Sequence, residues 1–293
     1  MVCDDFIYNN KSLSDFNMIM CDPDEAQKFV SREIIKTNQS SIRPVPNHFS
    51  TQYSDVLLLN FCIIKNTCTY HTQNEFKLTG TEIDELRSWL ESPQLPMELI
   101  TMDNESIDET YYYGIFNEVQ PFTIGSNCYG LYLTFTCNSP YGYSSPTKKT
   151  YNFNSHPDIK GVFINESSEQ NIPLYPLIKI YSNTDFNNTT LTIKNQSDNN
   201  QVMSIVLPIG LNFITVDCNK KQFVDQSGNI INIDAMGWSI SQLFNSDEFS
   251  TESYSFYWLR LLYGINKLEF TASSDTIDRI EIHTQFIRKA GGF

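Results

Sequence analysis

Short strand-like segments separated by turn residues dominate this sequence and limit the folds that it can adopt. In the second half they recur about every 8–12 residues, with Gly or Asn between them. Leu191 and Ile193 alternate with Thr190, Thr192 and Lys194, so that strand would bury one face. This pattern predicts an all-β sandwich or barrel. The strands expected in the second half span 148–153, 162–164, 175–181, 189–195, 202–207, 213–217, 230–233, 257–262, 268–271 and 277–287.

The first half also contains strand signals. Residues 6–8 (FIY), followed by Asn9 and Asn10, predict a strand and a tight turn, because Asn tolerates positive φ. The run 56–64 (VLLLNFCII) is almost continuously apolar, which is typical of a strand buried on both faces. Residues 14–50 contain three prolines and are expected to be loop with a short helix or strand. Further strands are expected over 97–102, 111–119, 122–124 and 129–137.

One segment, residues 79–90, predicts a helix. Thr79 and Glu82 have the spacing of a capping box, and Thr81 is the alternative N-cap. Pro93 and Pro96 would end the helix. The predicted packing face is Ile83, Leu86 and Leu90, which share one side of a helix.

The chain has 293 residues, near the limit of about 250–300 at which single hydrophobic cores stop growing. A Pro-, Gly- and Ser-rich stretch at 138–146 (NSPYGYSSP) is the best candidate for a boundary. We therefore expect an N-terminal domain over 1–145 and a C-terminal domain over 146–293.

The charge is strongly negative and unevenly distributed. The net charge is −14, and residues 1–145 hold 8 basic and 19 acidic residues, a net of −11. Residues 146–293 hold 12 basic and 15 acidic residues, a net charge of −3. A surface that adheres to nucleic acid needs clustered Lys and Arg, so this composition argues against DNA binding.

No catalytic or cofactor motif is present in the sequence. It lacks a Gly-rich phosphate loop, G-x-S-x-G and H-E-x-x-H, so we expect no catalytic residue, metal or cofactor. His156 and Asp158 are the nearest to an acid/base pair, but His-Pro-Asp is more typical of a turn. The seven cysteines include no C-x-x-C pair and are expected to be buried, reduced thiols. Neither a signal peptide nor a membrane-spanning run is expected.

Two clusters could nevertheless have a role. The acidic cluster looks like part of a hairpin tip, and a solvated loop is a simpler interpretation than catalysis or Ca²⁺ binding. Its members are Glu98, Asp103, Glu105, Asp108, Glu109 and Glu118. The aromatic cluster could stack on sugar rings or belong to the core. Its candidate glycan or partner contacts are Trp238, Tyr254 and Trp258.

The order of the segments resembles a known family. The first half contains FIYNNKSLSDF, VLLLNFCIIKN, TGTEIDELRSWLESP and LYLTFTCNSPYGYS. The second half contains YPLIKIYSN, TLTIKNQSDN, GLNFITVDCNKKQFVD and LLYGINKLEFTA. Together they resemble the distal tail proteins of bacteriophages with long, non-contractile tails. The resemblance covers nearly the whole chain.

The resemblance implies a mainly β, non-enzymatic protein of the virion tail tip, made in the host cytoplasm. It implies an N-terminal split β-barrel with one helix, which forms a hexameric ring, and a C-terminal jelly-roll or galectin-like β-sandwich. The expected partners are five further copies, the tail-tube protein and the tail hub protein. In such proteins the outer domain often carries the receptor-binding apparatus. DNA would be a passing cargo, and membrane insertion is not expected.

Two hypotheses follow for the N-terminal domain. The acidic cluster could line the ring channel and repel phosphates, although an ordinary solubilising surface explains the same charge. Unpaired strand edges could be satisfied by neighbouring copies, which would close the ring. The alternative function is a carbohydrate-binding module that recognises host cell-wall glycan through the C-terminal domain.

Overall fold

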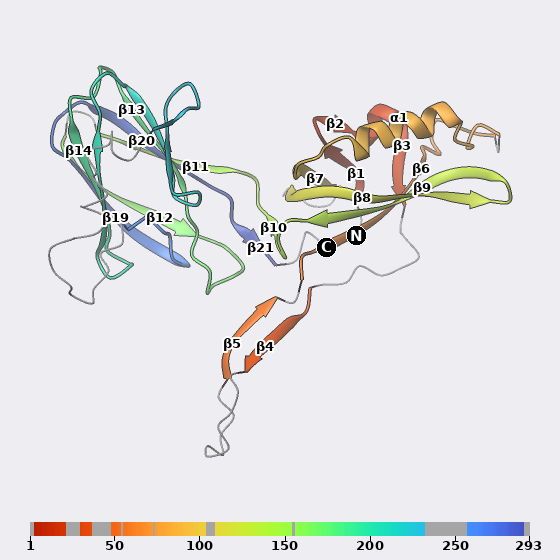
Figure 1. Cartoon of the computed structure of the whole chain (residues 1–293), viewed down its shortest axis with the longest axis horizontal. Coiled ribbons are helices and arrows are strands. Elements are labelled where there is room, and N and C mark those ends of the chain that lie inside the picture. The colour runs from red at the N-terminus through yellow and green to blue at the C-terminus, as the bar shows by residue number, and fades with distance from the viewer. Residues whose placement is uncertain are drawn as a thin grey trace, which may run out of the picture. The chain divides into compact units, whose positions relative to one another are not determined.

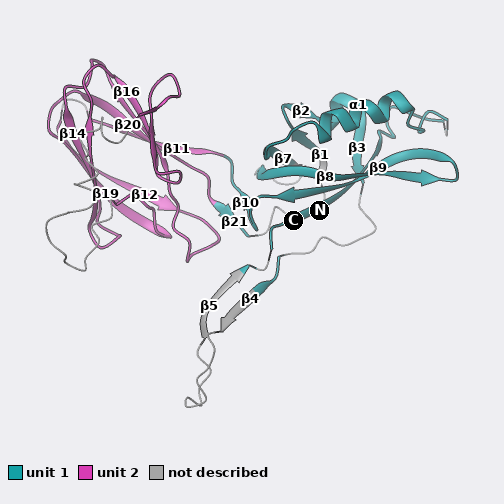
Figure 2. Cartoon of the chain, in the orientation of Figure 1, with its two compact units in different colours: residues 1–145, 287–293 teal, residues 146–286 magenta. Residues whose placement is uncertain are grey.

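The computed structural model describes residues 3–21, 30–36, 48–53, 55–72, 74–103, 109–153, 156–231 and 257–289. The chain divides into two compact units (Figure 2). Unit 1 comprises Met1–Ser145 with Ile287–Phe293, and unit 2 comprises Pro146–Phe286. The expected mainly β class is confirmed, because strands dominate both units (Figure 1). The described residues contain one α-helix and one short 3₁₀ helix.

Unit 1 is built on a nine-stranded antiparallel sheet with the main order β2-β1-β7-β8-β9-β6-β3. No pairing joins its end strands, β2 and β3, in the described part of the chain, so the sheet is not a closed barrel. β10 pairs with β8 and with β21, and this pairing brings the last strand of the chain into unit 1. The strands are β1 (Cys3–Tyr8), β2 (Lys11–Ser12), β3 (Met18–Cys21), β6 (Leu58–Lys65), β7 (Met97–Asp103), β8 (Thr110–Ile124), β9 (Asn127–Cys137), β10 (Gly142–Tyr143) and β21 (Ile287–Arg288).

The predicted first turn is confirmed. Asn9 and Asn10 join β1 to β2 with φ of 48° and 60°, the left-handed conformation that a two-residue hairpin turn needs. The buried strand expected over 56–64 is β6, whose centre, Phe61–Ile63, is buried at three consecutive positions. Residues 14–50 are expected to be loop with a short helix or strand, and the described part of this segment begins with a 3₁₀ helix (Leu13–Phe16) that leads into β3.

The described residues between 30 and 53 contain more strand than the expected loop with a short helix or strand. Two strands, β4 (Arg32–Lys36) and β5 (His48–Tyr53), form a separate antiparallel hairpin. Pro44 and Pro46, which favoured a loop, lie outside the described residues.

The predicted helix is α1 (Gly80–Glu91), and Thr79 is its N-cap. The Thr79 hydroxyl accepts a bond from the Glu82 amide, and the Thr79 amide donates to Glu82 Oε2 at 2.7 Å, which completes the capping box. The other oxygen of Glu82 lies 2.7 Å from Nζ of the buried Lys65 on β6. The cap therefore also ties the start of the helix to the sheet.

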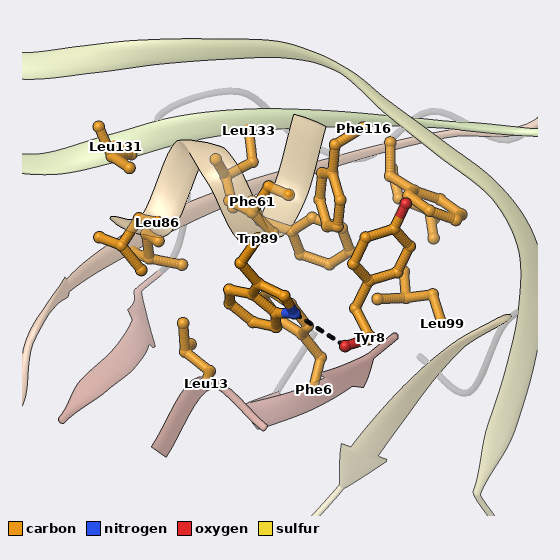
Figure 3. Close-up of a cluster of buried hydrophobic side chains, with 14 of the residues drawn as sticks. Phe6, Tyr8, Leu13, Phe61, Leu86, Trp89, Leu99, Phe116, Leu131 and Leu133 are labelled. Carbon is orange, nitrogen blue, oxygen red and sulfur yellow. Dashed lines mark hydrogen bonds between the residues drawn. The ribbon is translucent and has the colours of Figure 1, made fainter. Parts of the chain in front are cut away.

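The helix packs on the sheet through an aromatic core (Figure 3). Trp89 stacks on Phe6, with ring centroids 5.7 Å apart, and on Phe16 at 4.6 Å. Its indole N–H donates to the Tyr8 carbonyl oxygen at 2.9 Å. Leu86 and Leu90 are buried in the same cluster, and Ile83 packs against it while partly exposed. The predicted packing face omitted Trp89, which buries the largest side chain of the helix.

Unit 2 is a pair of antiparallel sheets with buried residues between them. The six-stranded sheet has the order β11-β20-β13-β16-β17-β18, and the four-stranded sheet has the order β12-β19-β14-β15. Buried and accessible side chains alternate along β14, where every second residue is buried. The strands are β11 (Thr147–Asn152), β12 (Asp158–Asn165), β13 (Leu177–Ser182), β14 (Thr189–Asn195), β15 (Gln201–Leu207), β16 (Phe213–Asp217), β17 (Gln222–Val224), β18 (Ile230–Ile231), β19 (Gly264–Ala272) and β20 (Ile277–Thr284).

The strand expected over 257–262 is not formed. Side chains rather than a neighbouring strand satisfy most of this segment's polar backbone groups. Buried Asn165 and Asn195 donate to the carbonyl oxygens of Leu261 and Arg260, at 3.0 and 2.9 Å. A single bridge to Leu174 is the only strand-like pairing described there. Asparagine side-chain amides thus make hydrogen bonds that a neighbouring strand would otherwise make. The hydrophobic periodicity of the sequence does not reveal such bonds.

A buried carboxylate fixes the same segment. Asp198 is 2% exposed and accepts two bonds from Arg260, at 2.6 and 3.0 Å, and one from the Tyr257 hydroxyl at 2.8 Å. The hydrogen bonds from Arg260 hold the pKa of the Asp198 carboxyl below its usual value, against the opposing effect of burial.

We expect Thr79→Ala to destabilise unit 1 by about 1 kcal/mol, because the Glu82 amide loses its acceptor. The matched control is Thr81→Ala, which changes an exposed threonine that is not the N-cap. Urea denaturation followed by tryptophan fluorescence measures both free energies of unfolding. Equal losses in the two variants would show that the cap contributes nothing.

We expect Asp198→Asn to destabilise unit 2 by about 2 kcal/mol at pH 7, because charge-assisted bonds to Arg260 are lost. A carboxyl with a lowered folded pKa stabilises above its unfolded pKa of about 3.9, and this contribution falls as pH drops through the folded pKa. The deficit of the variant should therefore shrink below about pH 4. Thermal unfolding at several pH values between acid and neutral measures this stability deficit. The control variant is Asp275→Asn, which changes an exposed carboxylate. A deficit that is independent of pH would contradict this assignment.

Candidate assembly surfaces

The structure places three residues of the predicted acidic cluster. Glu98 lies on β7, Glu118 lies on β8, and Glu109 directly precedes β8; all three are exposed. Asp103 is the last residue of β7, and its side chain lies outside the described residues, as do Glu105 and Asp108. The cluster therefore extends beyond a hairpin tip, because Glu98 and Glu118 are strand residues.

Glu98 and Glu118 share one face of the sheet. Glu98 pairs with Tyr113 and Glu118 pairs with Thr134, while the adjacent Leu99 points into the core. Side chains alternate across a strand, so both carboxylates lie on the face opposite the core. This face is available for contact with solvent, a neighbouring copy or a passing polyanion.

Tyrosine hydroxyls donate to two of these carboxylates. Tyr113 Oη lies 3.2 Å from Glu98 Oε2, and Tyr111 Oη lies 2.7 Å from Glu109 Oε2. The bond to Glu109 and partial burial raise the pKa of Tyr111 to about 12. Tyr111 therefore remains a neutral donor at physiological pH and leaves the negative charge of Glu109 in place.

One edge of β8 is open. Among the described strands, β7 pairs with β8 from Thr110 to Gly114, whereas β9 follows β8 to its end at Ile124. A bulge between Phe116 and Glu118 interrupts the strand. Pro121 has no backbone N–H to offer. Bulges and prolines are common protections of free edges, so this edge is poorly suited to pair with another chain.

The β4–β5 hairpin has no comparable protection within the described strands. Neither strand pairs with any other described strand. Arg32 lies over the Tyr53 ring at 4.9 Å, and Tyr53 contacts Tyr141 with ring centroids 5.1 Å apart. A lone two-stranded hairpin is marginally stable in water. Its outer edges are therefore the strongest candidates for pairing with another chain.

The predicted aromatic cluster is not assembled into a site by the described residues. Trp238 and Tyr254 lie outside them. Trp258 is half-buried and packs against Phe223, with ring centroids 5.3 Å apart. Trp258 thus packs against the buried Phe223 of unit 2 and remains partly accessible.

A groove of about 620 Å³ runs beside α1 in unit 1. Its lining includes the aromatic residues Trp89 and Phe16 and the charged residues Asp84, Glu85 and Lys11. No group of three or more His, Cys, Asp or Glu that could bind a metal occurs in the described part of the chain. None of its described helices is long and apolar enough to span a membrane.

The comparisons with known proteins agree with this architecture. Residues 1–139 match a family described as phage tail protein N-terminal domain. The Dit protein of phage SPP1 is similar in structure, with 14% identity and a TM-score of 0.61 over 96% of this chain and 98% of that chain. The phage P2 baseplate, in its calcium-activated conformation, matches with 11% identity and a TM-score of 0.52 over 99% of both chains. The strontium-activated P2 baseplate matches with 13% identity and a TM-score of 0.50 over 99% of both chains. No curated protein sequence matches the chain significantly.

The family match covers the part of the chain that forms most of unit 1 and is to a phage tail protein N-terminal domain. At 11–14% identity the structural matches show a shared fold. The two units together have the fold of a distal tail protein, so the resemblance predicted from the order of the segments is confirmed.

Proposed function

We propose that this chain is a non-enzymatic subunit of the phage tail tip, in which six copies form a ring between the tail tube and the tail hub. The fold match to SPP1 Dit over almost the full length of both chains carries this proposal. That protein is described as a paradigm of the hub adsorption apparatus in phages that infect Gram-positive bacteria. The partners would be the tail-tube protein, the hub protein and the adhesion apparatus.

The β4–β5 hairpin supports a specific route to ring closure. Its edges are unpaired in the described chain, and pairing with an identical neighbour would satisfy them. A head-to-tail contact of this kind closes into a ring when the rotation between copies permits it. Unit 1 would form the ring, and unit 2 would remain available for adhesion proteins.

The acidic surface supports passage of DNA through such a ring. Residues 1–145 carry a net charge of −11, and Glu98 and Glu118 face away from the core. A negatively charged channel would repel phosphates and let DNA slide, whereas a basic channel would bind it through counterion release.

We expect the full-length protein at tens of micromolar to have six times the chain mass of 33.8 kDa by multi-angle light scattering. A variant with residues 32–53 replaced by a short Gly-Ser linker should have the mass of a monomer. Its tryptophan fluorescence should remain native, because α1 and its core do not include the hairpin. A monomeric wild type would contradict the ring, and a hexameric variant would contradict closure by the hairpin.

We expect the double variant Glu98→Lys and Glu118→Lys to bind duplex DNA. The two substitutions make the proposed channel more positive by four charge units per chain. An electrophoretic mobility assay should show binding at about 50 mM salt and its loss by about 200 mM. The control, Glu166→Lys with Asp275→Lys, makes the same charge change at exposed positions of unit 2. Equal retention by both variants would place the two carboxylates outside the channel.

A further inference from the structure

Two cysteines lie opposite each other on neighbouring strands of unit 1. Cys21 is the last residue of β3, and the antiparallel register of β3 with β6 places it directly opposite Cys62. The residues beside them in sequence, Met20, Phe61 and Ile63, pack in or against the core of unit 1. Because side chains alternate across a strand, both thiols lie on the face of the sheet that is turned away from this core.

The backbone spacing at this pair matches that of a disulfide. The Asn66 amide donates to the Asn17 carbonyl oxygen at 2.9 Å, one step before the β3–β6 ladder begins. Hydrogen-bonded and non-hydrogen-bonded pairs alternate along an antiparallel ladder, so Cys21 and Cys62, four residues further along each strand, form a hydrogen-bonded pair. The Cα atoms of such a pair are about 5.5 Å apart, and disulfides most often join Cα atoms about 5.5–6 Å apart.

The side chains need only a small adjustment to bond. The Cys21 thiol already donates to the Cys62 carbonyl oxygen, with Sγ 3.4 Å from that oxygen. Opposed residues have Cβ atoms about 4.5–5.5 Å apart, and a disulfide needs about 3.5–4.5 Å, so the strands must approach by about 1 Å. β3 can supply this movement, because it is a four-residue strand at the end of the sheet with β6 as its only described pairing partner.

Among the six cysteines whose side chains are described, strand register opposes only this pair. Cys128 and Cys137 lie opposite other residue types, and Cys68 and Cys218 lie outside the strands. Burial raises the pKa of the Cys137 thiol to about 12, so that thiol is a poor nucleophile. Cys68 is exposed, so the expectation of buried thiols is wrong at that position.

We propose that Cys21 and Cys62 form a disulfide when the protein meets an oxidant, which is a small-molecule disulfide such as oxidised glutathione. The Cys21 thiol, the more accessible of the two, loses its proton and attacks one sulfur of the oxidant, which releases one small thiolate and leaves a mixed disulfide. The Cys62 thiol then loses its proton and attacks the Cys21 sulfur, which releases the second small thiolate. Two protein thiols are oxidised, one small disulfide is reduced, and the two protons pass to the released thiolates.

The disulfide fastens the segment that carries the β4–β5 hairpin. Both strands lie between Cys21 and Cys62 in sequence, so the bond closes this segment into one loop. Closing a loop removes conformations from the unfolded chain and thereby stabilises the folded one. Thiols stay reduced in the cytoplasm and oxidise outside the cell, so in a tail protein the bond forms after the virion is released. The inference does not depend on ring formation, because both cysteines belong to one copy of unit 1.

Oxidation of the native full-length protein, followed by peptide mass spectrometry, tests this proposal. Oxidised glutathione is the oxidant, and the protein is then digested with trypsin without reduction. Cleavage at lysines places Cys21 in peptide 12–28 and Cys62 in peptide 37–65, each with one cysteine. These two peptides should be joined, with a mass two hydrogens below their sum. The exposed Cys68 should carry glutathione, which shows that the reagent is active.

Serine variants assign the order of the two steps. In Cys62→Ser, Cys21 should retain glutathione as the mixed disulfide, because no second thiol displaces it. In Cys21→Ser, Cys62 should stay unmodified, because its side chain is only 4% exposed. The matched control is Cys128→Ser, which removes a half-buried thiol of the same sheet and should leave the joined peptides unchanged. Thermal unfolding verifies that each variant is folded.

Absence of the joined peptides in the wild type, while Cys68 carries glutathione, would overturn the proposal. The same conclusion would follow if Cys21 were joined to a different cysteine, or if Cys128→Ser lost the joined peptides. An equal yield of joined peptides from urea-unfolded protein would show that strand register does not direct the reaction. The wild-type peptide map decides the proposal even where a serine variant fails to fold.

Discussion

Backbone hydrogen bonding is the constraint on which this structure depends. The chain is made mainly of strands, and every strand edge must be paired, protected or covered. Three solutions occur. Buried asparagines satisfy segment 257–262, where no strand forms. A bulge and Pro121 protect the long edge of β8 that no described strand pairs with. The β4–β5 hairpin has neither device among the described residues, and this difference is why we assign it to contact with another copy.

The aromatic core of unit 1 determines which face of its sheet is exposed to solvent. Trp89 joins α1 to β1 through two ring stacks and a bond to the Tyr8 carbonyl. Lys65 joins the start of the helix to β6 through Glu82. With the helix fixed on one side, the opposite face of the sheet carries Glu98 and Glu118 toward solvent. The core occupies one face of the sheet, and alternate side chains of β7 and β8 point to the other face. The acidic surface follows from this alternation.

Local sequence signals predicted a large part of the fold. The Asn9–Asn10 turn, the capping box at Thr79 and the alternation in β14 each depend on residues close in sequence, and each is confirmed. Long-range side-chain bonds were not predictable in the same way. Asn195 and Asp198 fix Arg260 from about sixty residues away, so a segment with strand-like composition remains irregular.

The candidate sites show the same limit. Acidic residues were recognisable from composition, but their distribution between strand and turn became clear from the pairing of β7 with β8. The polar row on the outer face of β20 was missed, although Arg279, Glu281 and His283 occupy every second position of that strand. That spacing places three polar side chains on one face, yet the stacking of Arg279 on Tyr181 joins strands that are distant in sequence.

Cryo-electron microscopy of the purified full-length protein tests the central claim most directly, because it shows both symmetry and the orientation of each subunit. We predict a six-fold annulus in which each β4–β5 hairpin extends a sheet of the adjacent subunit and Glu98 and Glu118 point into the central hole. Single particles of one chain, or an annulus with these carboxylates on its outer rim, would contradict the account.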